Sequence, residues 1–186
     1  MNTQTQRGFT IIELLLVVTL MGILSFIAIP SIGDFVQNNR LKGSMYDLLN
    51  SINQARTEAV KRKSAVTICR SNDALDASPN CTGTTNDWSD GWLVFEDDDG
   101  DGVFDSADDT RISAGIATTG TVQIIGTANN MIYNPNGSIR SSTVVRFAVC
   151  DNRGNTNGRQ INVTRSGRGS LDYYPITSCT APVANP

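Results

Sequence analysis

The chain has 186 residues, of which 39% are hydrophobic and 18% are charged, and its formal net charge is −3. This balance fits one globular domain with a short addition. It excludes a disordered chain, a multi-span membrane protein and a chain that binds nucleic acid along its whole length. The chain has no histidine, which excludes His-based catalytic triads, His general bases and His metal sites.

The N-terminal region carries a long apolar run from Ile11 to Ile29 with one charged residue, Glu13. A helix needs about 20 apolar residues to span a bilayer, so this run is just long enough for one span. A cleaved secretory signal would place its small-residue cleavage site after the apolar region, but Gly8 lies before it. A plain signal anchor leaves Glu13 unexplained, because a carboxylate inside lipid costs about 2.5–3.5 kcal/mol or more.

The residues around Gly8 carry a more specific pattern. Residues 7–14, Arg-Gly-Phe-Thr-Ile-Ile-Glu-Leu, resemble the prepilin cleavage and methylation site of type IV pilins and type II secretion pseudopilins. The resemblance implies that prepilin peptidase cuts after Gly8 on the cytoplasmic side, that Phe9 is N-methylated, and that the apolar segment is kept as a helix. Glu13 and Pro30 fall where the family has its glutamate and a helix-kinking proline, so we expect both to serve assembly.

The same resemblance gives Glu13 a partner. Cleavage leaves a cationic amine on Phe9, and a buried carboxylate is relieved by a neighbouring positive charge. We therefore expect Glu13 to pair with the Phe9 amine of an adjacent subunit, first in the membrane and then in a filament core.

After Pro30 the sequence becomes amphipathic. One helical face is formed by residues that follow each other in steps of three and four, namely Leu41, Met45, Leu48, Ile52, Ala55 and Ala59. The pattern predicts one long helix from about Phe9 to about Arg62, with its first half in lipid and its second half packed on a soluble domain. Pro30 lacks an amide hydrogen, so we expect it to bend or loosen the helix near the boundary.

From Ser64 onward the hydrophobic period changes to two, and clusters of Gly, Asn, Ser and Asp separate the apolar segments. The predicted strands are Ala65–Cys69, Gly91–Glu96, Thr121–Ile125, Met131–Tyr133, Thr143–Cys150 and Arg159–Thr164. The predicted fold class is α+β and type IV pilin-like, with a long helix packed on a mostly antiparallel β-sheet. The predicted organisation is a cleaved leader (1–8), a transmembrane half of the helix (9–30), an amphipathic half (31–63) and a periplasmic head (64–186).

The head resembles one branch of the family, the minor pilins and pseudopilins of the GspH/FimT type. The matching segments are Ala55–Ala59, Thr67–Ser71, Trp88, Gly91–Asp97, Tyr133–Gly137 and Ser166–Arg168. The branch implies low-copy subunits that prime or cap a filament. It also implies other pilins or pseudopilins as partners, and a single-pass anchor in the bacterial inner membrane with the head in the periplasm.

Four cysteines can form two disulfides in an oxidising compartment, in any of three pairings. We expect neighbours to pair, Cys69 with Cys81 and Cys150 with Cys179. A metal site built from these cysteines is disfavoured, because the chain has no CxxC motif and no histidine.

The segment from Glu96 to Asp109 contains eight acidic residues and no basic one. Its spacing is that of a calcium-binding loop, with candidate ligands Asp97, Asp99, Asp101, the Val103 carbonyl, Asp105 and Asp108. An aspartate stands at the last position in place of the usual bidentate glutamate, which weakens binding. The flanks are strand-like, so the alternative is a solvated acidic hairpin tip without an ion.

The C-terminal part of the chain is basic, with seven arginines from Thr110 onward. Some relatives take up DNA through an arginine-rich motif near the C-terminus, and Arg159, Arg165 and Arg168 are the candidate DNA contacts here. The sequence after Gly167 keeps only the first part of that motif. Arginines on exposed strands also serve as solvated or acid-paired residues.

The sequence offers no catalytic motif: it lacks histidine, a nucleophile elbow, a P-loop and a dinucleotide-binding turn. The resemblance implies a minor type IV pilin that assists filament assembly for twitching, adhesion or DNA uptake. Three alternatives stay open: an H-type minor pseudopilin of type II secretion, a DNA-binding pilin for transformation, and a plain anchored periplasmic domain.

Overall fold

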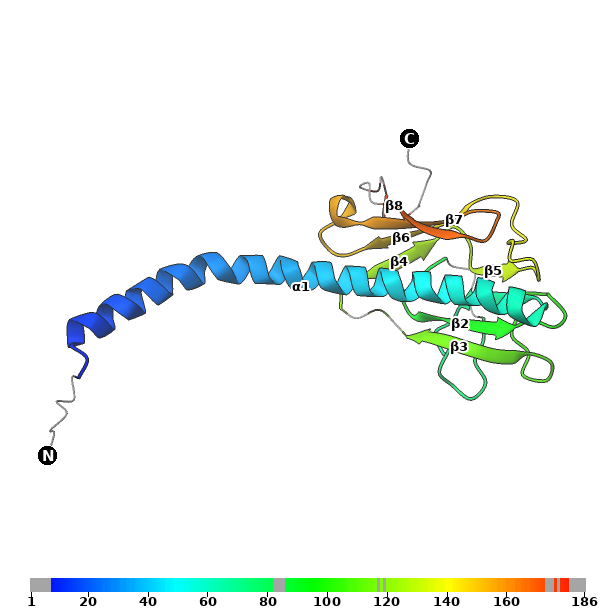
Figure 1. Cartoon of the computed structure of the whole chain (residues 1–186), viewed down its shortest axis with the longest axis horizontal. Coiled ribbons are helices and arrows are strands. Elements are labelled where there is room, and N and C mark those ends of the chain that lie inside the picture. The colour runs from blue at the N-terminus through cyan, green and yellow to red at the C-terminus, as the bar shows by residue number, and fades with distance from the viewer. Residues whose placement is uncertain are drawn as a thin grey trace, which may run out of the picture. The chain divides into compact units, whose positions relative to one another are not determined.

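The computed structural model describes residues 8–81, 86–116, 118, 120–172, 176 and 178–180, and the side chains of residues 26–31 lie outside this description. Of the predicted leader, only Gly8 is described. The chain divides into two compact units, Met1–Asn38 and Asn39–Pro186. Its elements in chain order, labelled in Figure 1, are α1 (Ile11–Arg62), β1 (Val66–Arg70), β2 (Gly91–Glu96), β3 (Thr110–Ile116), β4 (Gln123–Gly126), β5 (Asn130–Tyr133), β6 (Val145–Cys150), the 3₁₀ turn η1 (Asn155–Asn157), β7 (Arg159–Val163) and β8 (Gly169–Asp172).

Helix α1 ends at Arg62, where the sequence predicts its end, and begins at Ile11, two residues after the predicted start. All six residues of the predicted apolar face are at most 3% exposed, so the 3.6-residue period correctly identified the side that packs on the head. The helix continues through Pro30. The bend predicted there falls on residues whose side chains lie outside the description, and it stays a prediction.

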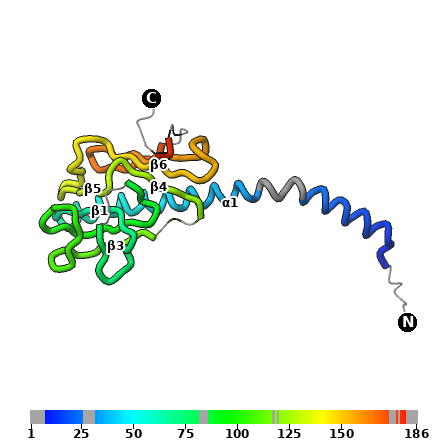
Figure 2. The backbone as a smooth tube through the Cα atoms, turned by 180° about the vertical axis from the view of Figure 1, so that it is seen from behind, coloured from blue at the N-terminus to red at the C-terminus, as the bar shows by residue number. Residues whose placement is uncertain are grey.

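The head contains two sheets, where the sequence predicted one. The first has the order β3-β2-β1-β5 and the second has the order β4-β6-β7-β8. Every neighbouring pair is antiparallel, which agrees with the prediction. Residues 86–88 link the sheets through Asp87, which bridges to Ile125 of β4, and through Trp88, whose amide donates to the Ile124 carbonyl at 2.8 Å. Figure 1 and Figure 2 show β4 and β6 beside the second half of α1, with which they share the hydrophobic core.

Strands β3 and β8 were not predicted, and each lies at an edge of its sheet. An edge strand has one hydrogen-bonded neighbour and a partly solvated face, so it needs less apolar alternation than a central strand. Strand β3 is half-buried or exposed along its whole length, and β8 contains no fully buried residue. Their sequences therefore look like loops.

One hydrophobic core joins the second half of α1 to both sheets. It includes Leu48 and Ile52 of the helix, Val94 of the first sheet and Phe147 of the second, all fully buried. The Trp88 ring meets the Phe147 ring edge to face, with centroids 5.0 Å apart. The head is thus a single packed unit, and the loops after β2, β5 and β7 are attached to it.

Candidate functional site

The start of α1 is fixed by a side-chain cap. The Thr10 hydroxyl oxygen accepts a hydrogen bond from the Glu13 amide at 3.3 Å, and the Thr10 carbonyl accepts one from the Leu14 amide at 3.2 Å. Glu13 lies in the first turn, where the helix dipole favours a negative charge. Thr10 is a site residue that the sequence analysis missed, although the spacing Thr-x-x-Glu is a known signature of helix caps.

The first turns of α1 expose an apolar surface on all sides. Every residue from Gly8 to Ser25 is exposed, including Phe9 at 85% and Ile11 at 81%. Glu13 is the single charged residue in that segment. A helix that is apolar all round belongs in a buried environment. Among the residues that the structure describes, no stretch of helix combines the length and hydropathy needed to cross a membrane.

Three of the segments that resemble the GspH/FimT branch meet at Arg56 of α1. The Arg56 Nε atom donates to the carbonyls of Gly137 at 3.2 Å and of Ser166 at 3.3 Å. The Tyr133 hydroxyl donates to the Gly167 carbonyl at 3.4 Å, and burial raises the pKa of that phenol. A Cβ on Gly167 would lie 2.0 Å from the Gly137 carbonyl oxygen, so only glycine fits this close approach.

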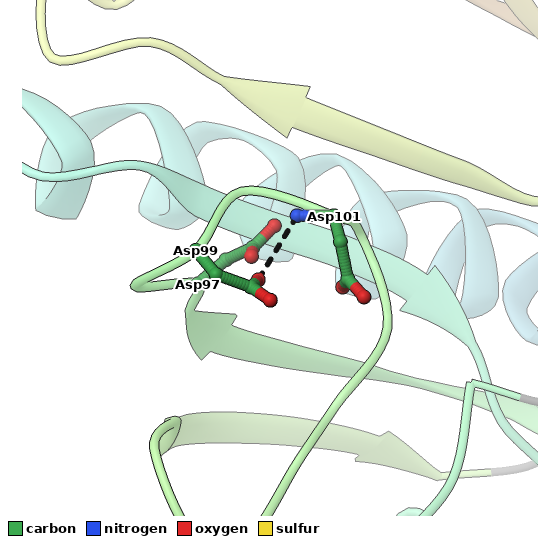
Figure 3. A group of neighbouring side chains, drawn as sticks. All are labelled: Asp97, Asp99 and Asp101. Carbon is green, nitrogen blue, oxygen red and sulfur yellow. Dashed lines mark hydrogen bonds between the residues drawn. The ribbon is translucent and has the colours of Figure 1, made fainter.

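The acidic loop between β2 and β3 gathers the first three of its predicted calcium ligands (Figure 3). Asp97, Asp99 and Asp101 each place a carboxylate oxygen within 4.8 Å of the others. Asp97 is fully buried, and its Oδ2 accepts from the Thr67 hydroxyl at 2.6 Å and from the Gly102 amide at 3.1 Å. Asp99 Oδ1 accepts from the Asp101 amide at 3.1 Å. Thr67 lies on β1, 30 residues earlier, and the sequence analysis did not connect it with this loop.

Asp105 and Asp108 do not join this group among the described residues. The Val103 carbonyl stays a predicted ligand. Asp105 Oδ1 accepts from the Ala107 amide at 2.9 Å. Asp109, which was not predicted, closes the loop by accepting from the amides of Asp98 at 3.1 Å and Asp105 at 2.9 Å. Burial raises the pKa of Asp109, and the nearby carboxylates add to that effect. Val103, Asp105 and Asp108 line, with Asp99 and Asp101, a pocket of about 250 Å³.

The structure joins the cysteines in the predicted neighbour pairing. Cys69 of β1 bonds to Cys81, and Cys150 at the end of β6 bonds to Cys179. The second bridge packs with Ala148 and Ile176 in a small apolar cluster. The two bridges fasten the long loop after β1 and the segment after β8 to the sheets.

The three candidate DNA-binding arginines are not brought together. Arg159 begins β7, and its guanidinium donates to the carbonyls of Asn157 and Gly158. Arg165 and Arg168 are exposed and lie in the turn that follows β7. A strand rises about 3.3 Å per residue, so the length of β7 separates Arg159 from the other two.

Two family models match this chain. Residues 46–167, more than half of the chain, match the family described as type II transport protein GspH. Residues 3–29 match the prokaryotic N-terminal methylation motif, a range that includes Gly8, Phe9 and Glu13.

Similar proteins carry fimbrial names. A fimbrial protein of Pseudomonas aeruginosa is 26% identical over 131 residues, which cover 70% of this chain and 85% of that protein. Fimbrial protein EcpC of Eikenella corrodens is 44% identical over 41 residues, covering 22% of this chain and 27% of that protein. A crystal structure of the type IV minor pilin FimU of Pseudomonas aeruginosa matches with a TM-score of 0.58 at 23% identity, over 78% of this chain and 98% of that one. A second crystal form of FimU gives 0.55 at 21% identity, over 74% and 98%. The structural likeness establishes the α+β pilin fold.

Proposed function

This chain belongs to the GspH family, and from that premise we propose that it is a minor type IV pilin that helps to prime or cap a filament. The observation that carries the proposal is the start of α1, which is apolar on all sides, has Glu13 as its one charge and lies within an N-terminal methylation motif. Burying one Leu or Ile side chain is worth about 1.5–3 kcal/mol. Such a helix is therefore stable only when lipid or the helices of other subunits cover it.

The maturation that this role needs follows from the motif. We infer that prepilin peptidase removes residues 1–8, that Phe9 becomes the methylated N-terminus, and that the helix anchors the subunit in the inner membrane before assembly. The head then lies in the periplasm. Two disulfides support this location, because such bonds persist in oxidising compartments. The role is structural, and the head contributes contacts with other pilins.

The second candidate is an H-type minor pseudopilin of a type II secretion system. The name of the matching family favours it, whereas the names of the similar proteins favour a pilus. Both assemblies use a processed helix of the same kind, so the choice between them needs a cellular experiment.

The arrangement of the arginines gives DNA binding no comparable support, and a gel shift of the protein at low salt tests it.

The test is deletion of the gene, followed by parallel measurement of surface filaments, twitching, protein secretion and transformation. We expect filament number and twitching to fall and secretion to persist. The wild-type gene should restore filament number and twitching. Loss of secretion with normal filaments would instead assign the chain to type II secretion. No change in any of the four would overturn both proposals.

Complementation with Gly8→Leu tests maturation in the same strain. A Cβ at Gly8 meets no atom within 4 Å, so the substitution leaves the fold undisturbed and acts on cleavage alone. We expect an uncleaved protein that fails to restore filaments. The control is wild-type protein in a strain without prepilin peptidase, which should migrate like the variant. A Gly8→Leu protein that stays uncleaved and still restores filaments would show that processing is dispensable.

A further inference from the structure

The carboxylate of Asp97 is buried and only half satisfied. The residue is 0% exposed, and both hydrogen bonds that it accepts go to Oδ2, from Thr67 and Gly102. Its other oxygen, Oδ1, is buried with no hydrogen-bond partner. Buried polar atoms are almost always paired, and leaving one without a partner is costly, above all when the atom belongs to a charged group. This atom therefore indicates a ligand that completes the site.

Two further carboxylates lie beside it. Asp99 and Asp101 are exposed, and each brings an oxygen within 4.8 Å of the Asp97 carboxylate (Figure 3). The chain achieves this by reversing at Gly100 and Gly102, whose φ angles of 74° and 80° favour glycine. One buried and two solvent-facing carboxylates thus converge on one point.

The protein supplies little positive charge at that point. The ion pairs of the described residues do not include Asp97, Asp99 or Asp101. The guanidinium of Arg140 reaches the loop, but it donates to the Gly100 carbonyl and to the side chain of Asn134. Three carboxylates this close repel one another unless a cation lies between them.

We propose that Asp97, Asp99 and Asp101 bind a calcium ion, with Asp97 Oδ1 as the buried ligand. Calcium takes six to eight oxygen ligands in a flexible geometry, whereas magnesium requires a near-ideal octahedron. Three carboxylates leave the remaining positions to water, which reaches the ion from the exposed side of Asp99 and Asp101. Because only three carboxylates gather among the described residues, and Asp109 is engaged in closing the loop, the affinity falls in the range of extracellular modules, a Kd of about 10⁻⁴–10⁻³ M.

The bound ion would fasten the β2–β3 loop to the first sheet, since the Asp97 carboxylate is also held by Thr67 of β1. This inference is independent of the proposed role in filaments. Either one can fail without the other, because the calcium measurement uses purified protein and the filament count uses cells.

The experiment is thermal unfolding of the full chain in detergent micelles, first stripped with chelator and then supplied with calcium or magnesium at about 5 mM. A calcium concentration tenfold above Kd should raise the melting temperature by about 3–6 °C. Magnesium at the same concentration should raise it by less. Calorimetric titration with calcium chloride gives the Kd directly. No rise with calcium, or an equal rise with magnesium, would overturn the assignment.

Matched amide variants separate a bound ion from general charge repulsion. Asp99→Asn and Asp101→Asn keep the side-chain oxygens that accept from the amides of Asp101 and Val103, so both variants should fold. Each should abolish the calcium-dependent rise. Asp98→Asn removes the same charge from an exposed neighbour outside the cluster and should keep the rise. If Asp98→Asn and Asp99→Asn lose the calcium-dependent rise in melting temperature equally, calcium acts by screening the negative charge of the loop, and the proposed site is wrong.

Discussion

Two aspartates are buried among the described residues of the head, and the structure satisfies them in different ways. Asp151 has a side chain only 1% exposed and is paired with Arg153, whose Nη2 lies 2.6 Å from Oδ2 and whose Nε and amide also donate to the carboxylate. Asp97 accepts from a hydroxyl and an amide and has no guanidinium partner. A paired buried charge is structurally complete, whereas an unpaired one is costly. The contrast explains why only Asp97 indicates an external ion.

We expect Asp151 to make the stability of the head depend on pH in the acid range. The hydrogen bonds from Arg153 hold the pKa of this carboxyl below its ordinary value of 3.8. The stabilisation is therefore complete above that ordinary value and is lost as the pH falls through the lower, folded-state pKa. We predict that Asp151→Asn lowers the free energy of unfolding by about 1–3 kcal/mol at neutral pH. The difference from wild type should shrink below a pH of about 4.

Urea unfolding of both proteins at neutral and acidic pH measures this effect. Asp76→Asn is the matched control, because Asp76 is exposed and the variant should stay within about 0.5 kcal/mol of wild type. A deficit in Asp151→Asn that is the same at both pH values would contradict the assigned role of the ionised carboxylate.

At the scale of elements, α1 is held to the head by polar bonds as well as by its apolar face. Arg56 connects the helix to the loop after β5 and to the turn between β7 and β8, which belong to different sheets. At its last turn, Arg62 forms ion pairs with Glu58 at 2.6 Å and with Glu96 of β2 at 2.8 Å. These bonds fix the helix relative to both sheets, and the apolar contacts supply most of the stabilisation.

We predict that Arg56→Ala lowers the free energy of unfolding by about 1–3 kcal/mol, because two carbonyls lose a charged donor. Lys42→Ala removes the same charge from an exposed position of α1 and should change stability by about 0.5 kcal/mol or less. Chemical denaturation of the two variants makes the comparison. Equal losses in both would show that the Arg56 hydrogen bonds contribute nothing beyond net charge.

The sequence predicted those elements whose signal is local. The helix face at Leu41 to Ala59 and the central strands β1, β2, β6 and β7 were identified because buried segments carry a strong apolar period. The edge strands β3 and β8 lack that signal. The separation into two sheets was also missed, because strand pairing across distant segments leaves no periodic trace.

The same distinction holds for the candidate site. The grouping of Asp97, Asp99 and Asp101 follows from alternate positions in one short loop, so spacing alone predicted it. Thr67 is 30 residues away from Asp97, and the carbonyl partners of Arg56 are 81 and 110 residues away. Contacts between residues so far apart in the sequence depend on the whole fold, and no local sequence pattern predicts them.

At the scale of the whole molecule, the two parts of the chain face opposite requirements. The unit from Asn39 onward buries its apolar side chains within itself, including Trp88, Trp92 and Phe95. The segment from Phe9 to Ser25 leaves its apolar side chains exposed. An apolar surface of this kind is what we expect of a subunit whose N-terminal helix is covered by lipid or by neighbours.

Substitutions of Glu13 test how such a subunit recognises its neighbours. Its position suits two roles, an acidic residue in the first helical turn capped by Thr10 and a partner for the Phe9 amine of an adjacent subunit. Glutamine keeps the first role, since a capping box accepts Glu or Gln, but it carries no charge. We predict that Glu13→Gln and Glu13→Ala are both cleaved normally. Both should enter filaments at least about tenfold less than wild type, because leaving the Phe9 amine unpaired among buried helices costs more than about 1.4 kcal/mol.

Immunoblots of sheared filaments against whole-cell protein measure that ratio. Asp47→Asn, which removes an exposed carboxylate from the second half of α1, should enter filaments like wild type. If Glu13→Gln assembles normally while Glu13→Ala does not, the Glu13 side chain serves the helix cap and forms no ion pair with the Phe9 amine of an adjacent subunit. If both assemble normally, assembly depends on the apolar surface of α1 alone.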